Sequence, residues 1–233
     1  MPKTIFLFAD TALELIPHKL YNNEIIKKYA TKKNKNPSQF LLDSSYHYKA
    51  MKNISDFKKR GRPDIIHFCL MNLIESTLVC TNPSLIEIYI HTIKNKIIEV
   101  NTQTRLPKNF DRFKGLMVQL LHQKKIEANN KILMKVLEGE TVQTILANIQ
   151  PDRRFIFSFD GKKTDLMETF ESNSENDLVF IIGGFPYGKL STQILNLTNN
   201  VISIYPEALK AWIVLNKVIC LREITQANRD ENF

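Results

Sequence analysis

Short apolar runs recur along the chain and predict buried β-strands. The clearest are residues 5–8, 179–182 and 85–91, and the last of these are mostly β-branched or aromatic, as strand residues tend to be. Residues 97–100 can pair with residues 85–91 as a hairpin across the polar turn between them. Further strands are predicted at residues 40–42, 132–136, 155–159 and 201–205.

Three segments instead repeat apolar residues at the spacing of helices. The first begins at Pro63, which suits the first helical position because its missing N–H would have no partner there. The second begins near Pro107 and the third follows Pro206, whereas residues 160–177 are polar and predict a loop with a short helix. Strands alternating with helices in this order predict an α/β fold with an open, mostly parallel sheet flanked by helices.

The segment after residues 179–182 is the strongest candidate for a binding site. Three of the seven glycines fall within residues 183–188, between two predicted strands and ahead of a long helix. In open α/β sheets such loops form a ligand crevice at the carboxyl ends of the strands, and glycine allows the backbone to approach a ligand closely. The spacing G-G-x-x-x-G matches neither the dinucleotide fingerprint nor a P-loop, so a phosphate cradle is not indicated. An ordinary tight turn is the alternative.

Composition excludes several classes of protein. No apolar run approaches the ~20 residues of a membrane span, so no membrane partner is expected. The three cysteines are scattered and odd in number, which argues against a disulfide framework and favours a reducing compartment, with all three as small core residues. The histidines lack the spacing of metal ligands, and we predict no metal site and only packing or surface roles for them.

The formal net charge of +8 is unevenly distributed. Residues 1–125 carry 21 Lys+Arg and 10 Asp+Glu, a balance of +11, whereas residues 126–233 carry 11 and 14, a balance of −3. This asymmetry favours a polyanionic partner for the first half, and a solvated basic surface is the alternative. The lysine-rich run at residues 27–35 can contact phosphate, serve as a nuclear address, or do neither.

Three cations also gather where the second helix is predicted to begin. Lys108 and Arg112, four residues apart, are expected on one helical face, with Arg105 just before them. Like charges at this spacing cost a little stability, so a role in contacting phosphate is favoured over a purely structural one.

Six stretches together resemble one known family, the pseudouridine-N1-specific methyltransferases of small-subunit ribosomal RNA, within the SPOUT class. They are LLDSS at 41–45, RPDIIH at 62–67, IEIYIHT at 86–92, NTQTRLPKNFDRFKGLMVQLLHQ at 101–123, IIGGFPYG at 181–188 and ISIYPEAL at 202–209. The stretches cover most of the chain in the family's order, and they look closer to the eukaryotic members than to the archaeal ones.

The resemblance implies a SPOUT-type α/β fold with a C-terminal trefoil knot, although chains rarely thread loops. A small β-rich insertion is expected in the sheet. Residues 1–233 would form one such domain, with a basic RNA-facing part at roughly 1–125 and a cofactor-binding knot region at roughly 150–225. The resemblance also implies a homodimer and a role in small-subunit assembly together with other assembly factors. A nucleolar or nuclear location is expected, and a cytoplasmic one is also open.

The resemblance further implies that S-adenosyl-methionine is the cofactor. Its expected contacts, mostly from backbone atoms, are Phe155, Gly183, Gly188, Ile202, Ser203, Ile204, Tyr205, Pro206 and Glu207. Glu207 departs from the family pattern, in which Tyr-Pro is usually followed by Leu-Ser-Ala.

A small-subunit rRNA hairpin is the expected substrate, contacted by Arg62, Arg105, Lys108 and Arg112. Lys108 stands where the family usually has arginine, which keeps the charge but loses the planar bidentate fork. Arg62 and Asp64 are the expected catalytic pair, with Asp64 holding Arg62 in place rather than acting as a general base. A non-catalytic rRNA-binding assembly factor and a SPOUT methyltransferase acting on tRNA are the alternatives.

Overall fold

The structure is a computed structural model that describes the backbone of residues 2–230 and the side-chain surroundings of residues up to 225. Its centre is an eight-stranded sheet with the strand order β4-β5-β3-β2-β1-β7-β6-β8. Strands β2, β1, β7, β6 and β8 run parallel to one another, and β3, β5 and β4 extend the sheet antiparallel beyond β2. The mostly parallel α/β sheet and the small β-rich insertion are thus confirmed, and the trefoil knot stays a prediction.

The strands lie close to the apolar runs of the sequence. Their bounds are Thr4–Thr11 (β1), Ile86–Thr92 (β2), Ile97–Val100 (β3), Lys125–Ala128 (β4), Lys131–Leu137 (β5), Arg154–Lys163 (β6), Leu178–Gly183 (β7) and Val201–Ser203 (β8). The hairpin of β2 and β3 is present, with Ile90 opposite Ile98.

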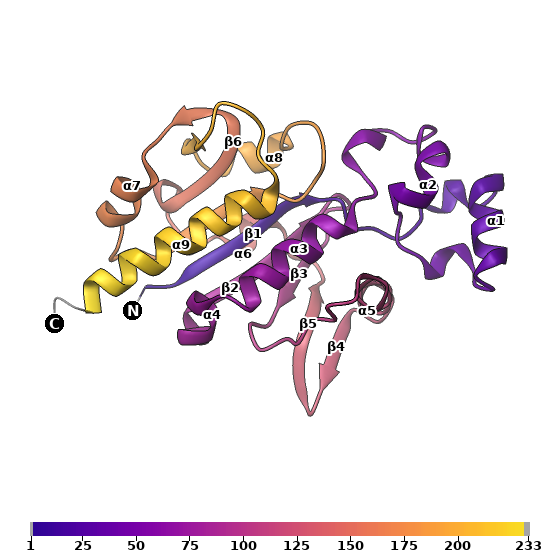
Figure 1. Cartoon of the computed structure of the whole chain (residues 1–233), viewed down its shortest axis with the longest axis horizontal. Coiled ribbons are helices and arrows are strands. Elements are labelled where there is room, and N and C mark those ends of the chain that lie inside the picture. The colour runs from indigo at the N-terminus through magenta and orange to yellow at the C-terminus, as the bar shows by residue number, and fades with distance from the viewer. Residues whose placement is uncertain (1, 231–233) are drawn as a thin grey trace.

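Helices cover both faces of the sheet, and α1 with α2 extends from one end of it (Figure 1). Their bounds are Glu24–Lys32 (α1), Ser44–Met51 (α2), Pro63–Ile74 (α3), Thr77–Thr81 (α4), Phe110–Gln123 (α5), Val142–Ile145 (α6), Leu166–Ser172 (α7), Thr192–Leu195 (α8) and Ala211–Asp230 (α9). No helix among the described residues is long and apolar enough to cross a membrane.

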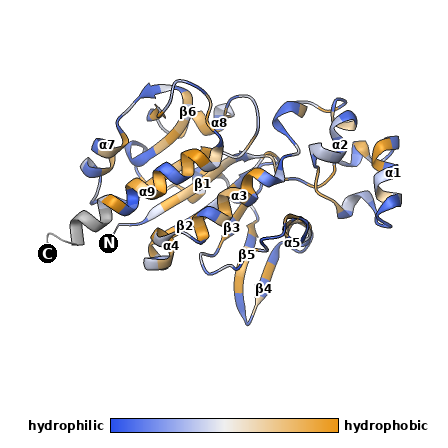
Figure 2. Cartoon of the chain, viewed as in Figure 1, coloured by the Kyte–Doolittle hydropathy of each residue, from blue (hydrophilic) through white to orange (hydrophobic). Residues whose placement is uncertain are grey.

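The alternation of side chains along β1 divides the core into two parts. Phe6 and Phe8 face the cluster formed with α3, α5 and α9, whereas Ile5 and Leu7 face the cluster formed with α6 and α8. All four side chains are almost completely buried because both faces of this central strand are covered. In Figure 2, apolar residues recur along α3 and α9, the two long helices that lie over the sheet.

Five local predictions were wrong in detail. Residues 40–42 are no strand, because a capped 3-10 turn ends at Gln39 and Leu41 makes only an isolated bridge with Leu15. Helix α5 begins at Phe110 rather than near Pro107, because the Asn109 side chain accepts the Arg112 N–H and caps the helix. Helix α9 begins only at Ala211, and β6 continues to Lys163 inside the predicted polar loop. Only one cysteine, Cys69, is buried, while Cys80 and Cys220 are exposed.

Candidate active site

A cavity of about 460 Å³ opens at the carboxyl ends of β6, β7 and β8, where the crevice of an open α/β sheet is expected. Three loops and the first turns of α3 and α9 surround it. Its lining consists of Arg62, Ile65, residues 157–159, Ile182, Gly183, residues 185–190, residues 202–205, residues 207–212 and Val214. Segments far apart in the sequence therefore meet at one site.

The loop after β7 requires glycine at two positions. A Cβ on Gly184 would lie 2.5 Å from the Thr11 Oγ1 and 3.0 Å from the Thr11 Cα. The backbone at this point is held to the end of β1, since the Gly184 N–H donates to the Ala9 carbonyl and the Gly184 carbonyl accepts the Ala12 N–H. Gly188 has a φ of +106°, which favours glycine. The tight packing of this loop gives the cavity a fixed backbone wall.

A buried ion pair supports the same loop from behind. The Lys59 ammonium lies 2.8 Å from the Asp10 carboxylate, donates to the Lys189 carbonyl at 2.7 Å, and sits 4.3 Å from the centre of the Phe185 ring. The Asp10 carboxylate also accepts hydrogen bonds from the Ser191 N–H and hydroxyl, at 2.6 and 2.9 Å. Lys59 thus connects the chain before α3 to the glycine loop.

Arg62 is the N-cap of α3, and Pro63 and Asp64 occupy the first turn as predicted. The guanidinium donates to Asp64 through two parallel bonds, Nε to Oδ1 at 2.8 Å and Nη2 to Oδ2 at 2.6 Å. These hydrogen bonds raise the pKa of Arg62 above its ordinary value. Two of the five guanidinium N–H groups are engaged in this way, and the others remain available at the cavity wall.

Most of the expected cofactor positions lie around the cavity. Those in its lining are Gly183, Gly188, Ile202, Ser203, Ile204, Tyr205 and Glu207. Phe155 and Pro206 are not in the lining. Phe155 is buried in the core, with its ring centre 6.2 Å from that of Phe180. Phe157 and the two residues after it line the cavity instead. Phe157 lies two residues, one strand period, nearer the carboxyl end of β6 than Phe155 does.

The predicted RNA-contacting cations are divided between two places. Arg62 lines the cavity, whereas Arg105, Lys108 and Arg112 are exposed and lie outside its lining. The Lys108 ammonium is 3.6 Å from Glu75, at the far end of α3 from Arg62 and about 18 Å away along the helix axis. Lys108 also precedes the cap of α5, so its predicted sharing of a helical face with Arg112 is wrong.

The histidines of the matched motifs make internal hydrogen bonds, as expected. His67 Nε2 lies 2.8 Å from the Pro107 carbonyl, which holds the segment before α5 against α3. His91 Nδ1 accepts the Asp10 N–H at 3.2 Å, and its Nε2 lies 3.0 Å from Asn95. Within the described part of the chain, no group of three or more His, Cys, Asp or Glu could hold a metal ion.

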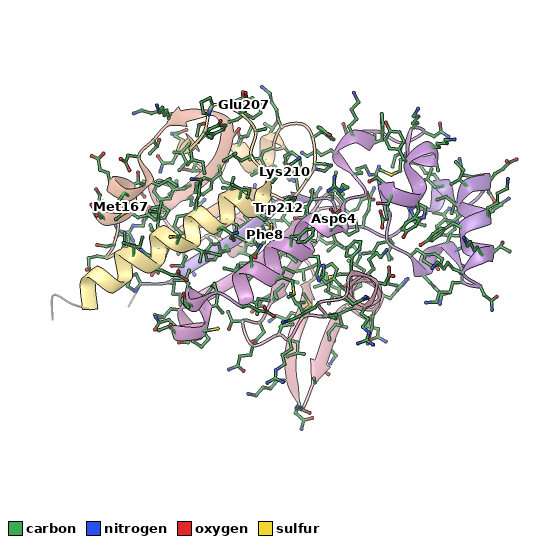
Figure 3. The ribbon with its side chains drawn as sticks, in the orientation of Figure 1. Phe8, Asp64, Met167, Glu207, Lys210 and Trp212 are labelled. Carbon is green, nitrogen blue, oxygen red and sulfur yellow. The ribbon has the colours of Figure 1, made fainter. Side chains whose placement is uncertain are left out.

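Sequence reasoning missed several residues of the site. Asp10, Lys59 and Ser191 were absent from the candidates, and so were Lys210 and Trp212, which line the cavity where α9 begins and are labelled in Figure 3. The one available signal was the position of Asp10, a polar residue next to the last position of the fully buried strand β1, at the edge where crevices form.

Comparison with known proteins agrees with this geometry. The sequence model of the family described as EMG1/NEP1 methyltransferase matches residues 6–223. A protein named ribosomal RNA small subunit methyltransferase Nep1 from Thermococcus sibiricus is 38% identical over 215 residues, which cover 91% of this chain and 94% of that protein. Its namesake from Pyrococcus furiosus is 35% identical over 219 residues, covering 91% and 93%.

A solved structure matches over nearly the whole fold. The crystal structure of Archaeoglobus fulgidus Nep1 bound to S-adenosylhomocysteine has a TM-score of 0.84 and 32% identity, and covers 97% of this chain and 99% of that one. These relatives are archaeal, so the expected closeness to the eukaryotic members stays a prediction. On the family match and the identity over most of its length, the chain belongs to the EMG1/NEP1 methyltransferase family.

Proposed function

We propose that this chain transfers the methyl group of S-adenosyl-methionine to N1 of a pseudouridine in small-subunit ribosomal RNA. The observation that carries the proposal is that Arg62, held by Asp64, and the glycine loop line the same cavity. The names of the relatives support methylation of small-subunit rRNA, and the S-adenosylhomocysteine in the Archaeoglobus structure supports the cofactor. The choice of pseudouridine N1 comes from the family resemblance of the motifs.

The residues of the cavity fit such a cofactor. Its volume of about 460 Å³ is in the usual range of small-molecule sites, about 300–1,000 Å³. A Cβ at Gly183 would lie 2.8 Å from the Phe185 ring, so glycine is favoured here and the backbone of the loop stays accessible at the site. Gly183, Gly188 and the loop of residues 202–207 would hold the cofactor, which when bound supplies an electrophilic methyl group on a sulfonium.

Arg62 is placed to orient the RNA at the cavity wall. Its side chain is 34% exposed, and Asp64 fixes its plane through the two parallel hydrogen bonds. The remaining N–H groups can hold a phosphate or a base edge. Holding the acceptor nitrogen in the correct orientation accelerates methyl transfer far more than a flexible contact would. Asp64 is therefore a positioning residue, because protonating its carboxylate would break the pair that holds Arg62.

The apolar part of the lining limits water at the reacting atoms. Ile65, Phe157 and Trp212 line the cavity together with backbone groups of the loops. Loss of the sulfonium charge during transfer is favoured by such a site, where fixed dipoles replace mobile solvent. The proton on N1 would leave through water or a polar group of the substrate, because the Asp64 carboxylate is engaged by Arg62.

Two further expectations belong to the proposal. A homodimer is supported by an exposed apolar patch, where Phe68 on α3 is 52% exposed and packs its ring 5.4 Å from that of Trp212 on α9. The lysine-rich first part of the chain supports an rRNA partner during subunit assembly, with assembly factors as neighbours. A nucleolar or nuclear location belongs to the same proposal, and a cytoplasmic one is its alternative.

A methyl-transfer assay tests the whole proposal. The chain is incubated with S-adenosyl-methionine carrying a labelled methyl group and with two RNA hairpins that differ only in a uridine or a pseudouridine at the target position. We expect label in the pseudouridine hairpin alone. Label in both hairpins, or in tRNA instead, would contradict the N1 assignment, and no label with either RNA despite calorimetric cofactor binding would contradict catalysis.

A further inference from the structure

Residues 18–60, named the arm below, carry the net charge of the molecule. They include α1 and α2, which project from the end of the sheet (Figure 1). The arm contains 11 Lys+Arg and 3 Asp+Glu, a balance of +8, and the rest of the chain contains 21 of each. The predicted charge asymmetry of the first half is thus a property of this arm, and such a concentration of one sign favours a polyanion.

The arm presents this charge to solvent. Its exposed lysines outnumber its exposed carboxylates, which are those of Glu24 and Asp56. These lysines are Lys19, Lys27, Lys28, Lys32, Lys33, Lys35, Lys49, Lys52 and Lys58. The ion pairs within residues 2–225 are formed by other cations. A surface that only needed solubility would mix the two signs.

A groove of about 740 Å³ lies on the arm, between the end of α1 and the 3-10 turn Pro37–Gln39. Ammonium, amide and hydroxyl groups line it together with Ala30 and Pro37. The polar groups belong to Tyr21, Lys27, Thr31, Asn34, Lys35, Asn36 and Gln39. Groups of these types make most protein contacts to phosphate and sugar.

Side-chain contacts connect the arm to α5. Tyr46 on α2 is 51% exposed, with its ring 5.1 Å from that of Tyr29 on α1 and 5.2 Å from the Lys114 ammonium on α5. His122 Nε2 at the end of α5 is 2.9 Å from the Ser38 carbonyl in the turn beside the groove. An exposed ring beside lysines is also a platform on which a nucleobase can stack.

The arm is fixed to the catalytic part of the fold. Arg60 forms a fully buried, bidentate pair with Glu14, at 2.6 and 2.5 Å, and Lys59 pairs with Asp10 at the end of β1. Both pairs lie directly before Arg62, which lines the cavity. The groove therefore keeps a set position relative to the reacting nucleoside.

We propose that the arm is a second RNA-contacting surface, in which the Lys27–Lys35 groove binds the phosphate backbone of rRNA flanking the target hairpin. The inference rests on the proposed function and deepens it, because it divides the substrate into a target loop at the cavity and a flanking segment at the arm. Binding of the flank neutralises phosphates, so affinity for long RNA depends on salt more steeply than affinity for the hairpin alone.

The test compares two RNAs and two double variants. The RNAs are a minimal pseudouridine hairpin and the same hairpin extended by flanking strands, and affinity is measured by fluorescence anisotropy over a range of salt. The variants are Lys27→Gln/Lys35→Gln in the groove and, as a matched control, Lys162→Gln/Lys163→Gln on β6, which also removes two exposed lysines. Exposed lysines contribute little to stability, and melting curves verify that both variants fold.

We expect the groove variant to bind the extended RNA about 10-fold more weakly, with a salt slope smaller by about 1 per lysine removed. Its affinity for the minimal hairpin and its methyl transfer to that hairpin should equal those of the unmodified chain and the control. Equal binding of both RNAs by the unmodified chain, or equal losses in groove and control variants, would overturn the proposal while leaving methyl transfer intact. Absence of transfer by the unmodified chain would instead refute the proposed function.

Discussion

The Lys59 ammonium and the Asp10 carboxylate form a largely buried ion pair at 2.8 Å, between the chain that leads to α3 and the end of β1. The lysine also donates to the Lys189 carbonyl, and the aspartate accepts two hydrogen bonds from Ser191. One pair of charges thereby fixes the chain at the carboxyl end of the glycine loop, and this part of the cavity wall depends on it.

We therefore expect Lys59→Met to weaken cofactor binding and to destabilise the fold by about 3 kcal/mol, since Asp10 would stay buried without its cation. Calorimetry with S-adenosylhomocysteine and urea unfolding measure the two effects. Adding Asp10→Asn to Lys59→Met should restore part of the stability, because it removes the unpaired charge. A double variant that is less stable than Lys59→Met would show that the pair is not the source of the effect.

Gly184→Ala should disturb the same wall by a different route. The added Cβ would lie 2.5 Å from the Thr11 Oγ1 and 3.0 Å from the Thr11 Cα, so backbone must move at a cost of about 1–3 kcal/mol and with loss of cofactor affinity. Gly115→Ala on α5 is the matched control, because nothing lies within 4 Å of its added Cβ. It should instead raise the free energy of unfolding by about 0.5–1 kcal/mol. Equal effects of the two substitutions would contradict the close approach.

Local pattern was enough to predict the parallel strands, the start of α3 and the glycine loop. Each depends on neighbouring residues: buried strands need continuous apolar runs, and Pro63 and Asp64 suit a helical first turn wherever it lies. The strand prediction for residues 40–42 was wrong because a short apolar run fits a strand as well as a buried turn. The Asn36 side chain caps the 3-10 turn before this run, and the chain continues from that turn without joining the sheet.

Contacts between residues far apart in the sequence could not be predicted from the local pattern of apolar and polar residues. Asp10 and Lys59 meet across 49 residues of sequence, and Asp10 meets Ser191 across 181, so neither contact has a local signature. The separation of Lys108 from Arg62 has the same origin, because the length of α3 and the contact of His67 with Pro107 set it. Charge counts located the basic half, but only the fold shows that its surplus belongs to the arm.

Arg62→Lys should lower turnover on the order of 10²-fold while keeping the positive charge, because lysine cannot reproduce the planar two-bond contact with Asp64. RNA affinity should fall more than cofactor affinity, since the lost N–H groups face the substrate. Steady-state methyl transfer and separate binding assays for RNA and S-adenosylhomocysteine distinguish the two. Unchanged RNA affinity would remove Arg62 from the substrate site.

His47 gives the stability a pH dependence. Burial lowers its pKa from 6.5 to about 4, helped by Lys114 and opposed by Asp43. Between these values the unfolded chain binds a proton that the folded chain does not, so this contribution is complete above pH 6.5 and is lost as the pH falls through about 4. The loss should be about 2–3 kcal/mol.

His47→Gln tests this dependence, because glutamine does not titrate and can still accept the Asp43 N–H that His47 Nδ1 accepts. Urea unfolding at a series of pH values should show a shallower slope between pH 6.5 and pH 4 in the variant. Other groups that titrate in this window, among them His91, whose pKa burial also lowers, are present in both proteins and cancel in the comparison. Identical slopes would contradict the assignment to His47.

Phe68→Lys should convert the proposed homodimer into a monomer. Phe68 is 52% exposed and extends the apolar surface around Trp212, and a patch of this kind beside an active site favours a protein partner. A charge there would be buried unpaired in the interface, whereas in a monomer it faces water, so the variant should keep its melting temperature at low concentration. Ile132→Lys on β5 is the control, since Ile132 is 44% exposed and lies on the antiparallel edge of the sheet. Sedimentation analysis should give the monomer mass for Phe68→Lys and the dimer mass for Ile132→Lys; the reverse order would move the interface to the β4–β5 edge.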